Sequence, residues 1–238
     1  MLASHPDDEV LGCGATIMRR VDEGAIVQIV IVTDGRHSHR SRIITADELA
    51  RLRKLEAIEA CARLGLRESQ LTFLEWEEGS VEASRSEIRS QLQRIIEELR
   101  PEEILVPSPL DGHHDHSALH GVVGELIGHT SSDAMFHEYP TWFWSAQSWT
   151  RQGASADTSL PAAINRLLNA VFRLKPMLVR TEGYLEGKKQ AVMAYRSQTT
   201  MLTDEPSWHI LDEQLLRSVF QAHEIFFEWS GRDGELAR

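Results

Sequence analysis

The stretch AIVQIVIVT at residues 25–33 is the longest strongly apolar run of the chain. Its apolar residues are continuous and rich in valine and isoleucine, which is typical of a strand buried on both faces of a parallel sheet. A membrane-spanning helix needs about 20 apolar residues, roughly twice this length. The run therefore predicts a central strand, and we expect no membrane span.

Helical patterns and further short apolar runs alternate after this strand. The runs at 71–76 and 103–107 predict two more strands, and helices are predicted over 47–65, 84–101 and 117–127. Such alternation predicts parallel strands joined by right-handed helical crossovers. We therefore expect an α/β fold, a Rossmann-like three-layer sandwich with a mostly parallel sheet.

Two of these predicted helices carry local signals for their faces and ends. An apolar stripe on the helix over 47–65 is formed by Leu52, Leu55, Ile58 and Ala62. Ser84 and Glu87 predict a capping box at the start of the helix over 84–101.

The second half of the chain differs in character. Residues 140–176 hold three of the six tryptophans and a loop-like stretch, and C-terminal α/β elements are predicted at 183–195, 210–221 and 223–229. No internal repeat or low-complexity tract divides the chain. We therefore expect a single domain over residues 1–238, in which 140–176 is a variable, Trp-rich insertion on the substrate side.

The composition is that of an ordinary soluble protein. Of the 238 residues, 42% are hydrophobic and 26% are charged, and the formal net charge is −11. This charge argues against a nucleic-acid partner, because phosphates would be repelled. The two cysteines are too few for a disulfide framework, and the first residues lack the basic and apolar regions of a signal peptide. We expect a cytoplasmic protein and leave a homo-oligomer open.

Polar residues crowd together near the start of the chain. The stretch SHPDDEVLGCG at residues 4–14 contains His5, Asp7, Asp8 and Glu9, followed by two glycines. Ligands of open α/β sheets bind beyond the carboxyl ends of the strands, so a strand should precede this stretch. Only MLAS is available for it, and this strand is therefore very short or begins upstream of the given residues.

A second polar cluster, DGHHDHSALH at residues 111–120, follows another predicted strand and holds four of the eleven histidines. Each cluster alone has an ordinary structural interpretation, as a polar loop or as an acidic helix start. Together they favour a metal site. His5 and Asp8 can point at one spot. A histidine of the second cluster would complete a set of three ligands, two imidazoles and one carboxylate. Hydrolytic Zn²⁺ sites use such a set with a position left for water, and non-haem Fe²⁺ suits the same ligands.

The quoted stretches resemble signatures of the PIG-L/LmbE-like family of zinc-dependent N-acetylglucosaminyl deacetylases. SHPDDE resembles the first signature and HHDH at 113–116 the second, while TDGRHSH at 33–39 and KKQAVMAYRSQ at 188–198 are similar to two further family stretches in the expected order. The likeness covers residues 1–130 and 183–200. His114 departs from the proline that many members carry at that place.

The resemblance implies roles that spacing alone leaves open. His5, Asp8 and His116 match the metal ligands of the family. Asp7 matches the general base, and His113 the histidine that stabilises the oxyanion and protonates the leaving amine.

Asp115 matches the carboxylate partner of that histidine. We expect it to keep His113 charged and oriented, because an adjacent carboxylate raises the pKa of an imidazole.

Other candidate residues lie outside these clusters. Arg36 and His37 belong to a basic patch after a predicted strand, which contacts either an anionic or hydroxyl-rich part of a substrate or only solvent. Trp142 and Trp144 are candidates for a wall on which a sugar ring stacks, against core or lid packing as the alternative.

The leading hypothesis is metal-dependent hydrolysis of the acetamide of an N-acetylated amino sugar conjugate, which releases acetate and a free amine. A metal-dependent phosphoesterase is the first alternative, because histidines and carboxylates also hold phosphate through metal ions. A non-catalytic sugar- or metal-binding protein on the same fold is the second. Asp7 and His113 count against that second alternative, since binding alone needs neither.

Overall fold

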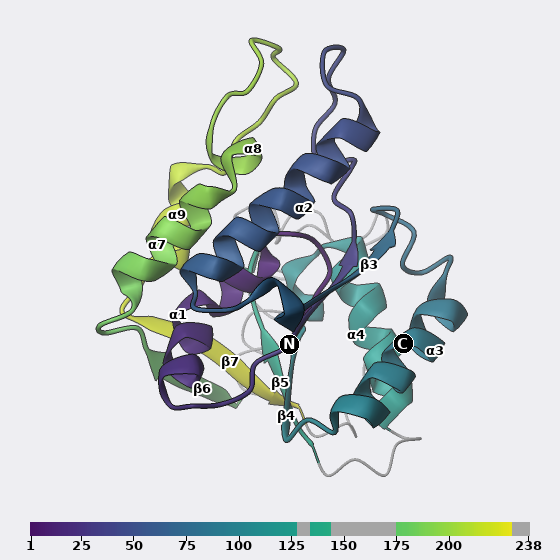
Figure 1. Ribbon diagram of the computed structural model, residues 1–238, viewed down its shortest axis with the longest axis vertical. Helices are drawn as coiled ribbons and strands as arrows, with labels where there is room; N and C mark the ends of the chain where they lie inside the picture. The colour runs from purple at the N-terminus through teal and green to yellow at the C-terminus, as the bar shows by residue number, and fades with distance from the viewer. Residues whose placement is uncertain (128–133, 144–174, 230–238) are drawn as a thin grey trace, which may run out of the picture.

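The computed structural model describes residues 1–127, 134–143 and 175–229, and its strands form two sheets (Figure 1). The first sheet has the order β1-β2-β3 and is parallel throughout, with the strands β1 (Leu2–Ala3), β2 (Ile29–Thr33) and β3 (Leu71–Trp76). The second has the order β4-β5-β7-β6, with the strands β4 (Glu103–Pro107), β5 (Met135–Tyr139), β6 (Pro176–Arg180) and β7 (His223–Trp229). β4 and β5 are parallel, whereas β7 is antiparallel to both of its neighbours. β1 contacts β4, so the two sheets adjoin at the centre of the fold.

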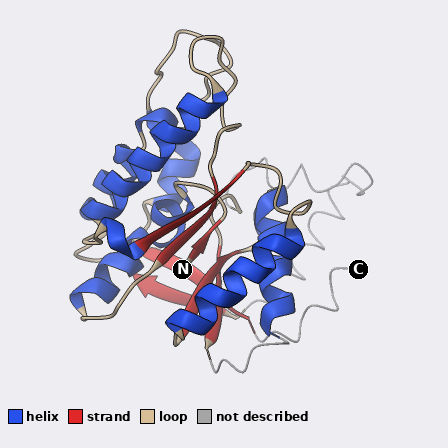
Figure 2. Cartoon of the chain, turned by 45° about the vertical axis from the view of Figure 1, so that its right-hand side comes forward, coloured by secondary structure: helices blue, strands red, loops and turns tan. Residues whose placement is uncertain are grey.

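Helices cover both faces of the sheets (Figure 2). They are α1 (Asp8–Asp22), α2 (Ala46–Arg63), α3 (Arg85–Leu99), α4 (His114–Ile127), α7 (Leu185–Ala194), α8 (Arg196–Thr199) and α9 (Glu213–Val219), with short 3₁₀ turns at Glu68–Gln70 and Pro109–Asp111. None of the helices within the described residues is both long and apolar enough to cross a membrane.

Alternate residues of the central strands supply two hydrophobic cores. Ala3, Ile29 and Ile31 pack with α1, α2 and α7, whereas Leu2, Val30 and Val32 pack with α3 and α4. Successive side chains of a strand point to opposite faces, so a strand with a core on either side must be apolar at every position. This explains the apolar residues at 29–33 and confirms the predicted three-layer α/β fold, whereas residues 25–28 precede the strand and Ile26 is 88% exposed.

Most predicted elements are confirmed, and the given residues contribute two residues to the first strand. β1 consists of Leu2 and Ala3 and pairs with β2 at Val30 and Ile31. α4 begins at His114, three residues earlier than predicted, so the histidine cluster forms its first turn. β5 and β6 were not predicted.

The predicted apolar stripe on α2 is wrong. Leu55 is 65% exposed and Ala62 is also exposed. The buried face instead contains Leu49, Arg53, Glu56, Ala57, Ala60 and Cys61. Arg53 and Glu56 point inward because both have partners there: Arg53 pairs with Asp7, and Glu56 accepts hydrogen bonds from the backbone and side chain of Ser197.

The capping box predicted at Ser84 is also wrong. Ser84 has φ −104° and ψ 21°, outside the extended region of an N-cap residue, and its side chain makes no capping hydrogen bond. A capping box occurs instead at α2, where Thr45 and Glu48 each bond the backbone of the other.

Helix α1 is held close to its neighbours by contacts that explain its two glycines. A Cβ atom on Gly12 would lie 2.3 Å from the ring of Tyr139, and one on Gly14 would lie 3.0 Å from the side chain of Lys188. The buried carboxylate of Glu224 accepts the N–H groups of Ala15 and Thr16 and pairs with Lys188 Nζ at 2.7 Å. These contacts fix the position of the helix whose first turn carries the acidic motif.

We expect Gly12→Ala to lower the free energy of unfolding by about 1–3 kcal/mol, because the buried ring of Tyr139 must move to admit the methyl group. Gly124→Ala in α4 is the matched control. Its Cβ would lie 3.4 Å from Trp229, an ordinary contact, so it should be neutral or stabilise by up to about 1 kcal/mol. Urea unfolding followed by circular dichroism measures both, and equal effects of the two substitutions would contradict this account of α1.

Candidate metal centre

His5 and Asp8 meet where β1 ends and α1 begins. The backbone N–H of His5 donates to Asp8 Oδ2 at 2.9 Å, and His5 Nδ1 lies 3.5 Å from the same oxygen. Asp8 is fully buried, and His5 is 5% exposed. Because the chain turns directly from strand into helix, both side chains point to the same place, as the sequence predicts.

His116 reaches this place from the first turn of α4. Its Nε2 lies 3.2 Å from Asp8 Oδ2, and its Nδ1 lies 2.8 Å from Asp111 Oδ2. Asp111 also accepts the backbone N–H groups of Thr141, Trp142 and Phe143. A carboxylate at Nδ1 keeps the proton of a neutral imidazole on that atom, which leaves the lone pair of Nε2 for a cation.

The buried atoms at this place fit a metal ion. Asp8 Oδ1 and His116 Nε2 are buried without a hydrogen-bond partner, although buried polar atoms nearly always have one. One side-chain nitrogen from each of His5, His113 and His116 lies within 4.8 Å of the others. Asp8 is in contact with two of these three rings, so three imidazoles and one carboxylate are candidate ligands.

The surrounding carboxylates favour positive charge on the rings. Burial disfavours the charged form of His5, but the hydrogen bonds to Asp115 and Asp8 outweigh it and raise its pKa to about 9. Burial also disfavours the charged form of His116. The negative charge of Asp8 and the hydrogen bond to Asp111 outweigh it and raise the pKa of His116 to about 10. A divalent cation can replace such protons, because metal binding and ligand protonation compete.

Asp7 lies beside these groups but faces a different partner. It is the N-cap of α1, with φ 117° in the left-handed region that non-glycine residues rarely adopt. Its Oδ2 accepts a hydrogen bond from the buried Arg53 at 2.8 Å, and Arg53 also bonds the carbonyl oxygen of Pro6. Burial raises the pKa of Asp7 to about 7, although the charge of Arg53 opposes the shift.

Glu9 continues the polar network away from the metal candidates. One of its oxygens accepts the backbone N–H of Asp7 at 3.1 Å, and the other accepts the hydroxyl of Tyr195. Burial raises the pKa of Glu9 to about 8. The stretch over 188–198, which is similar to a family stretch, therefore reaches the network through Tyr195.

The expected pairing of Asp115 with His113 is corrected by the structure. Asp115 Oδ2 lies 3.0 Å from His5 Nε2 and accepts the N–H of Gly79 at 2.8 Å. His113 instead accepts the backbone N–H of Asp115 at Nδ1. Burial, with the charges of His5 and His116, lowers the pKa of His113 to about 3, so its ring is neutral rather than charged.

The predicted substrate-binding residues that the structure describes do not gather at the candidate metal centre. Arg36 is bonded to Asp34 at 2.6 Å, and the exposed His37 lies 2.7 Å from Glu77. Trp142 packs against the core around α1, which agrees with the alternative of core packing. Trp144 lies outside the described residues.

Sequence reasoning missed Arg53 as a part of this network and assigned no role to Glu9. A signal for Arg53 exists, because it lies four residues after Leu49 and four before Ala57, on the face of α2 that is otherwise apolar. Glu9 carries no such signal, since an acidic residue in the first turn of a helix is common.

The chain is similar in sequence to a known family and to known deacetylases. The chain matches the model of the PIG-L family, described as GlcNAc-PI de-N-acetylase, over residues 1–127. It is 32% identical over 115 residues to diacetylchitobiose deacetylase of Thermococcus kodakarensis, a match that covers 47% of this chain and 42% of that protein. It is 26% identical to the 1D-myo-inositol 2-acetamido-2-deoxy-alpha-D-glucopyranoside deacetylase of Mycobacteroides abscessus, over 87% of this chain and 83% of that protein.

A solved structure shares the fold. N,N'-diacetylchitobiose deacetylase from Pyrococcus horikoshii superimposes with a TM-score of 0.68 and 18% identity, covering 98% of this chain and 83% of that one.

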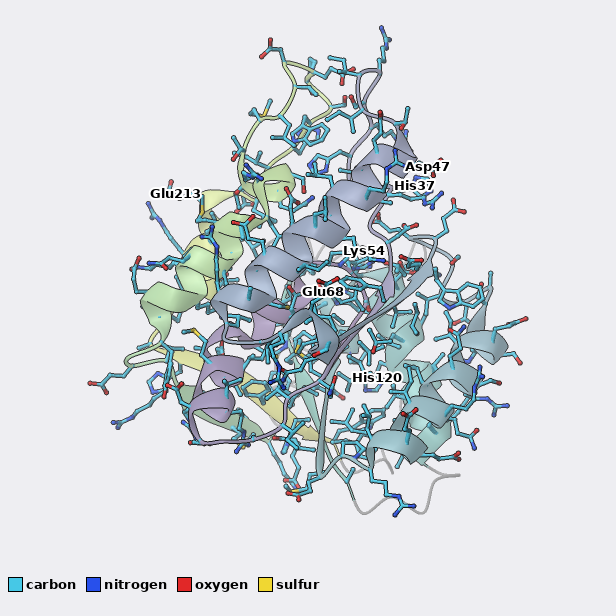
Figure 3. The ribbon with its side chains drawn as sticks, viewed as in Figure 1. His37, Asp47, Lys54, Glu68, His120 and Glu213 are labelled. Carbon is cyan, nitrogen blue, oxygen red and sulfur yellow. The ribbon has the colours of Figure 1, made fainter. Side chains whose placement is uncertain are left out.

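We expect the chain to bind Zn²⁺, and His5→Ala or His116→Ala to weaken binding more than about 100-fold, because loss of a ligand exceeds the 10–100-fold cost of losing a supporting group. His120→Ala is the control: His120, labelled in Figure 3, also lies on α4 but bonds Glu138. Competition with a chromophoric chelator measures the affinities. Unchanged affinity in both alanine variants would exclude this place as the metal centre.

We expect Asp111→Asn to weaken Zn²⁺ binding about 10–100-fold. The amide has one acceptor oxygen and no charge, so it cannot accept from both the ring of His116 and the backbone N–H groups that now hold the carboxylate. Glu138→Gln is the matched control, a carboxylate that bonds His120 at 2.8 Å on the same helix. The same chelator competition applies, and an equal loss in both variants would argue for general destabilisation instead.

Proposed function

The chain belongs to the PIG-L family, described as GlcNAc-PI de-N-acetylase, and from that premise we propose that it hydrolyses the acetamide of an N-acetylated amino sugar conjugate. The products are acetate and a free amine. The names of the two deacetylases similar in sequence support this reaction, because both describe acetylated amino sugars as substrates.

The observation that carries the proposal is the position of Asp7. Its carboxylate is bonded to Arg53, whereas the neighbouring Asp8 contacts His5 and His116. A protein that only bound a metal or a sugar would have no need for a buried carboxylate held beside the ligands in a strained backbone conformation. A general base needs this arrangement, because it must lie next to the metal without binding it.

We assign His5, Asp8 and His116 as the residues that hold Zn²⁺, with Fe²⁺ suited to the same donors. When bound, such a cation polarises an amide carbonyl and lowers the pKa of a water molecule to about 7. His113 remains free for another role in this assignment, although its ring lies against that of His5.

Asp7 accepts the proton of the attacking water. Its carboxylate is raised to a pKa of about 7, mainly by burial, and a base with a pKa near the working pH is the most effective. Arg53 contacts the same carboxylate and fixes its orientation, so the lone pair that takes the proton is positioned before the substrate arrives.

His113 donates a hydrogen bond to the oxygen that gains negative charge. Since Nδ1 accepts the backbone N–H of Asp115, the neutral ring carries its proton on Nε2. That proton stabilises the developing charge by hydrogen bonding. The leaving amine takes the proton that Asp7 has accepted from the water, so Asp7 returns to its charged form. Of the two roles that the resemblance implies for His113, this assignment keeps the stabilisation of the oxyanion, with a neutral ring as donor, and gives the protonation of the amine to Asp7. Asp115 supports it through its backbone N–H and through its contact with His5.

We expect the Zn²⁺-loaded protein to release amine from N,N'-diacetylchitobiose and to lose this activity with excess chelator. Asp7→Asn should lower kcat about 10²–10⁴-fold, because the amide cannot accept the proton. Asp22→Asn at the far end of α1 is the control and should leave kcat unchanged. Amine release is followed with a fluorogenic amine reagent, and the metal content is measured in parallel.

Full turnover by the metal-loaded Asp7→Asn protein would refute the assignment of the base. Cleavage of p-nitrophenyl phosphate without amine release from any N-acetylated sugar would favour the phosphoesterase alternative. Metal or sugar binding with neither reaction would favour a binding protein.

A further inference from the structure

The peptide bond between Pro6 and Asp7 is held at both of its polar ends. Its carbonyl oxygen, which belongs to Pro6, accepts a hydrogen bond from the side chain of Arg53. Its N–H group, which belongs to Asp7, donates to Glu9 Oε2 at 3.1 Å. Both partners, Arg53 and Glu9, are buried. Because a peptide bond is planar, hydrogen bonds at its two opposite ends fix the orientation of the whole plane.

This peptide plane sets the direction of the Asp7 side chain. The rotation between the plane and the Cα atom of Asp7 is its φ of 117°, in the left-handed region. On the other side, the carbonyl oxygen of Asp7 accepts the N–H groups of Val10 and Leu11 at 3.1 and 3.0 Å, where α1 begins. A non-glycine residue keeps such a conformation only where its surroundings enforce it. The backbone therefore aims the carboxylate of Asp7, and Arg53 then holds one of its oxygens.

Glu9 is in turn oriented by Tyr195. The second oxygen of Glu9 accepts the hydroxyl of this tyrosine, which is fully buried between α7 and α8. The ring of Tyr195 packs in the core shared by α1, α2 and α7, and α2 and α7 lie side by side (Figure 1). An acidic residue that only complemented the helix dipole would have no need of burial, which costs free energy unless both oxygens have partners.

We propose that Glu9 is a positioning residue for the general base. Through the peptide between Pro6 and Asp7 it fixes the backbone conformation that aims the Asp7 carboxylate, and Tyr195 holds Glu9 in place for this. The role rests on the proposed function, because it acts through the base assigned there. Within the described residues, the Glu9 side chain bonds Asp7 and Tyr195 and none of the candidate metal ligands. Its loss should therefore affect turnover rather than binding of metal or substrate.

Kinetics of the Zn²⁺-loaded protein with N,N'-diacetylchitobiose test this role. We expect Glu9→Ala to lower kcat about 100-fold with KM and Zn²⁺ affinity unchanged, because a displacement of about 1 Å at a reacting group costs about this factor. Tyr195→Phe loses only the hydroxyl and should lower kcat about tenfold. Glu9→Gln keeps an oxygen that accepts the N–H of Asp7, so its kcat should return to within about threefold of the wild type.

Glu56→Ala is the matched control. Glu56 is also a buried carboxylate, and it bonds the backbone and side chain of Ser197 in the same stretch as Tyr195, but not Asp7. We expect this substitution to lower the free energy of unfolding, because buried donors lose their acceptor, and to leave kcat within about twofold of the wild type.

A double-mutant cycle separates an effect through Asp7 from a general structural effect. In the Asp7→Asn protein, which already lacks the base, Glu9→Ala and the smaller change Tyr195→Phe should each lower the residual kcat less than about twofold. Equal losses with and without Asp7, or a parallel loss of Zn²⁺ affinity, would overturn the positioning role. So would a crystal structure of the Glu9→Ala protein in which the φ and the carboxylate of Asp7 are unchanged.

Failure of the proposed function gives a different result. A wild-type protein that releases no amine from any N-acetylated sugar would contradict the reaction itself. The crystal structure of the Glu9→Ala protein would then still decide whether Glu9 fixes the backbone of Asp7. Amine release by the wild type, with kcat unchanged in both Glu9→Ala and Tyr195→Phe, would overturn only the role of Glu9.

Discussion

The buried carboxylate of Asp8 is the group on which the rest of the site depends. It contacts His5 in its own turn and His116 on α4, more than 100 residues further along the chain. Charged carboxylates are rarely buried without compensation, because removal from water costs several kcal/mol. Two histidines compensate it here, and one of its oxygens still has no hydrogen-bond partner. A cation at this place would satisfy the carboxylate and both rings at once.

The fold brings these groups together through the ends of two adjoining strands. β1 leads into α1 and β4 leads toward α4, so both helices begin at the same edge of the sheets. The close packing of Gly12 on Tyr139 fixes α1 from one side, while Arg53 from α2 and Tyr195 between α7 and α8 hold the residues next to Asp8 from another. Asp7 is therefore strained but well supported, and Arg53 holds one oxygen of its carboxylate beside the ligand set.

The sequence predicts the layers and the meeting of the two clusters, because apolar patterns and strand ends are local signals. It does not predict which face of α2 is buried. Arg53 is a charged residue, and its burial depends on Asp7 and Pro6, which are distant in the chain. β5 was missed for the same reason: Glu138 is buried where it bonds His120 and Ser108. Asp115 pairs with His5 rather than with His113 because α4 lies beside the end of β1. Local sequence patterns do not predict this placement of the helix.

The central claim is that one cation joins His5, Asp8 and His116. Anomalous diffraction from crystals of the Zn²⁺-loaded protein, collected on both sides of the zinc edge, tests it most directly. The account predicts a single anomalous peak at about 2.0–2.2 Å from a nitrogen of each histidine and an oxygen of Asp8, with Asp7 unbound. A peak bound by His113 in place of Asp8, or located away from these residues, would contradict it.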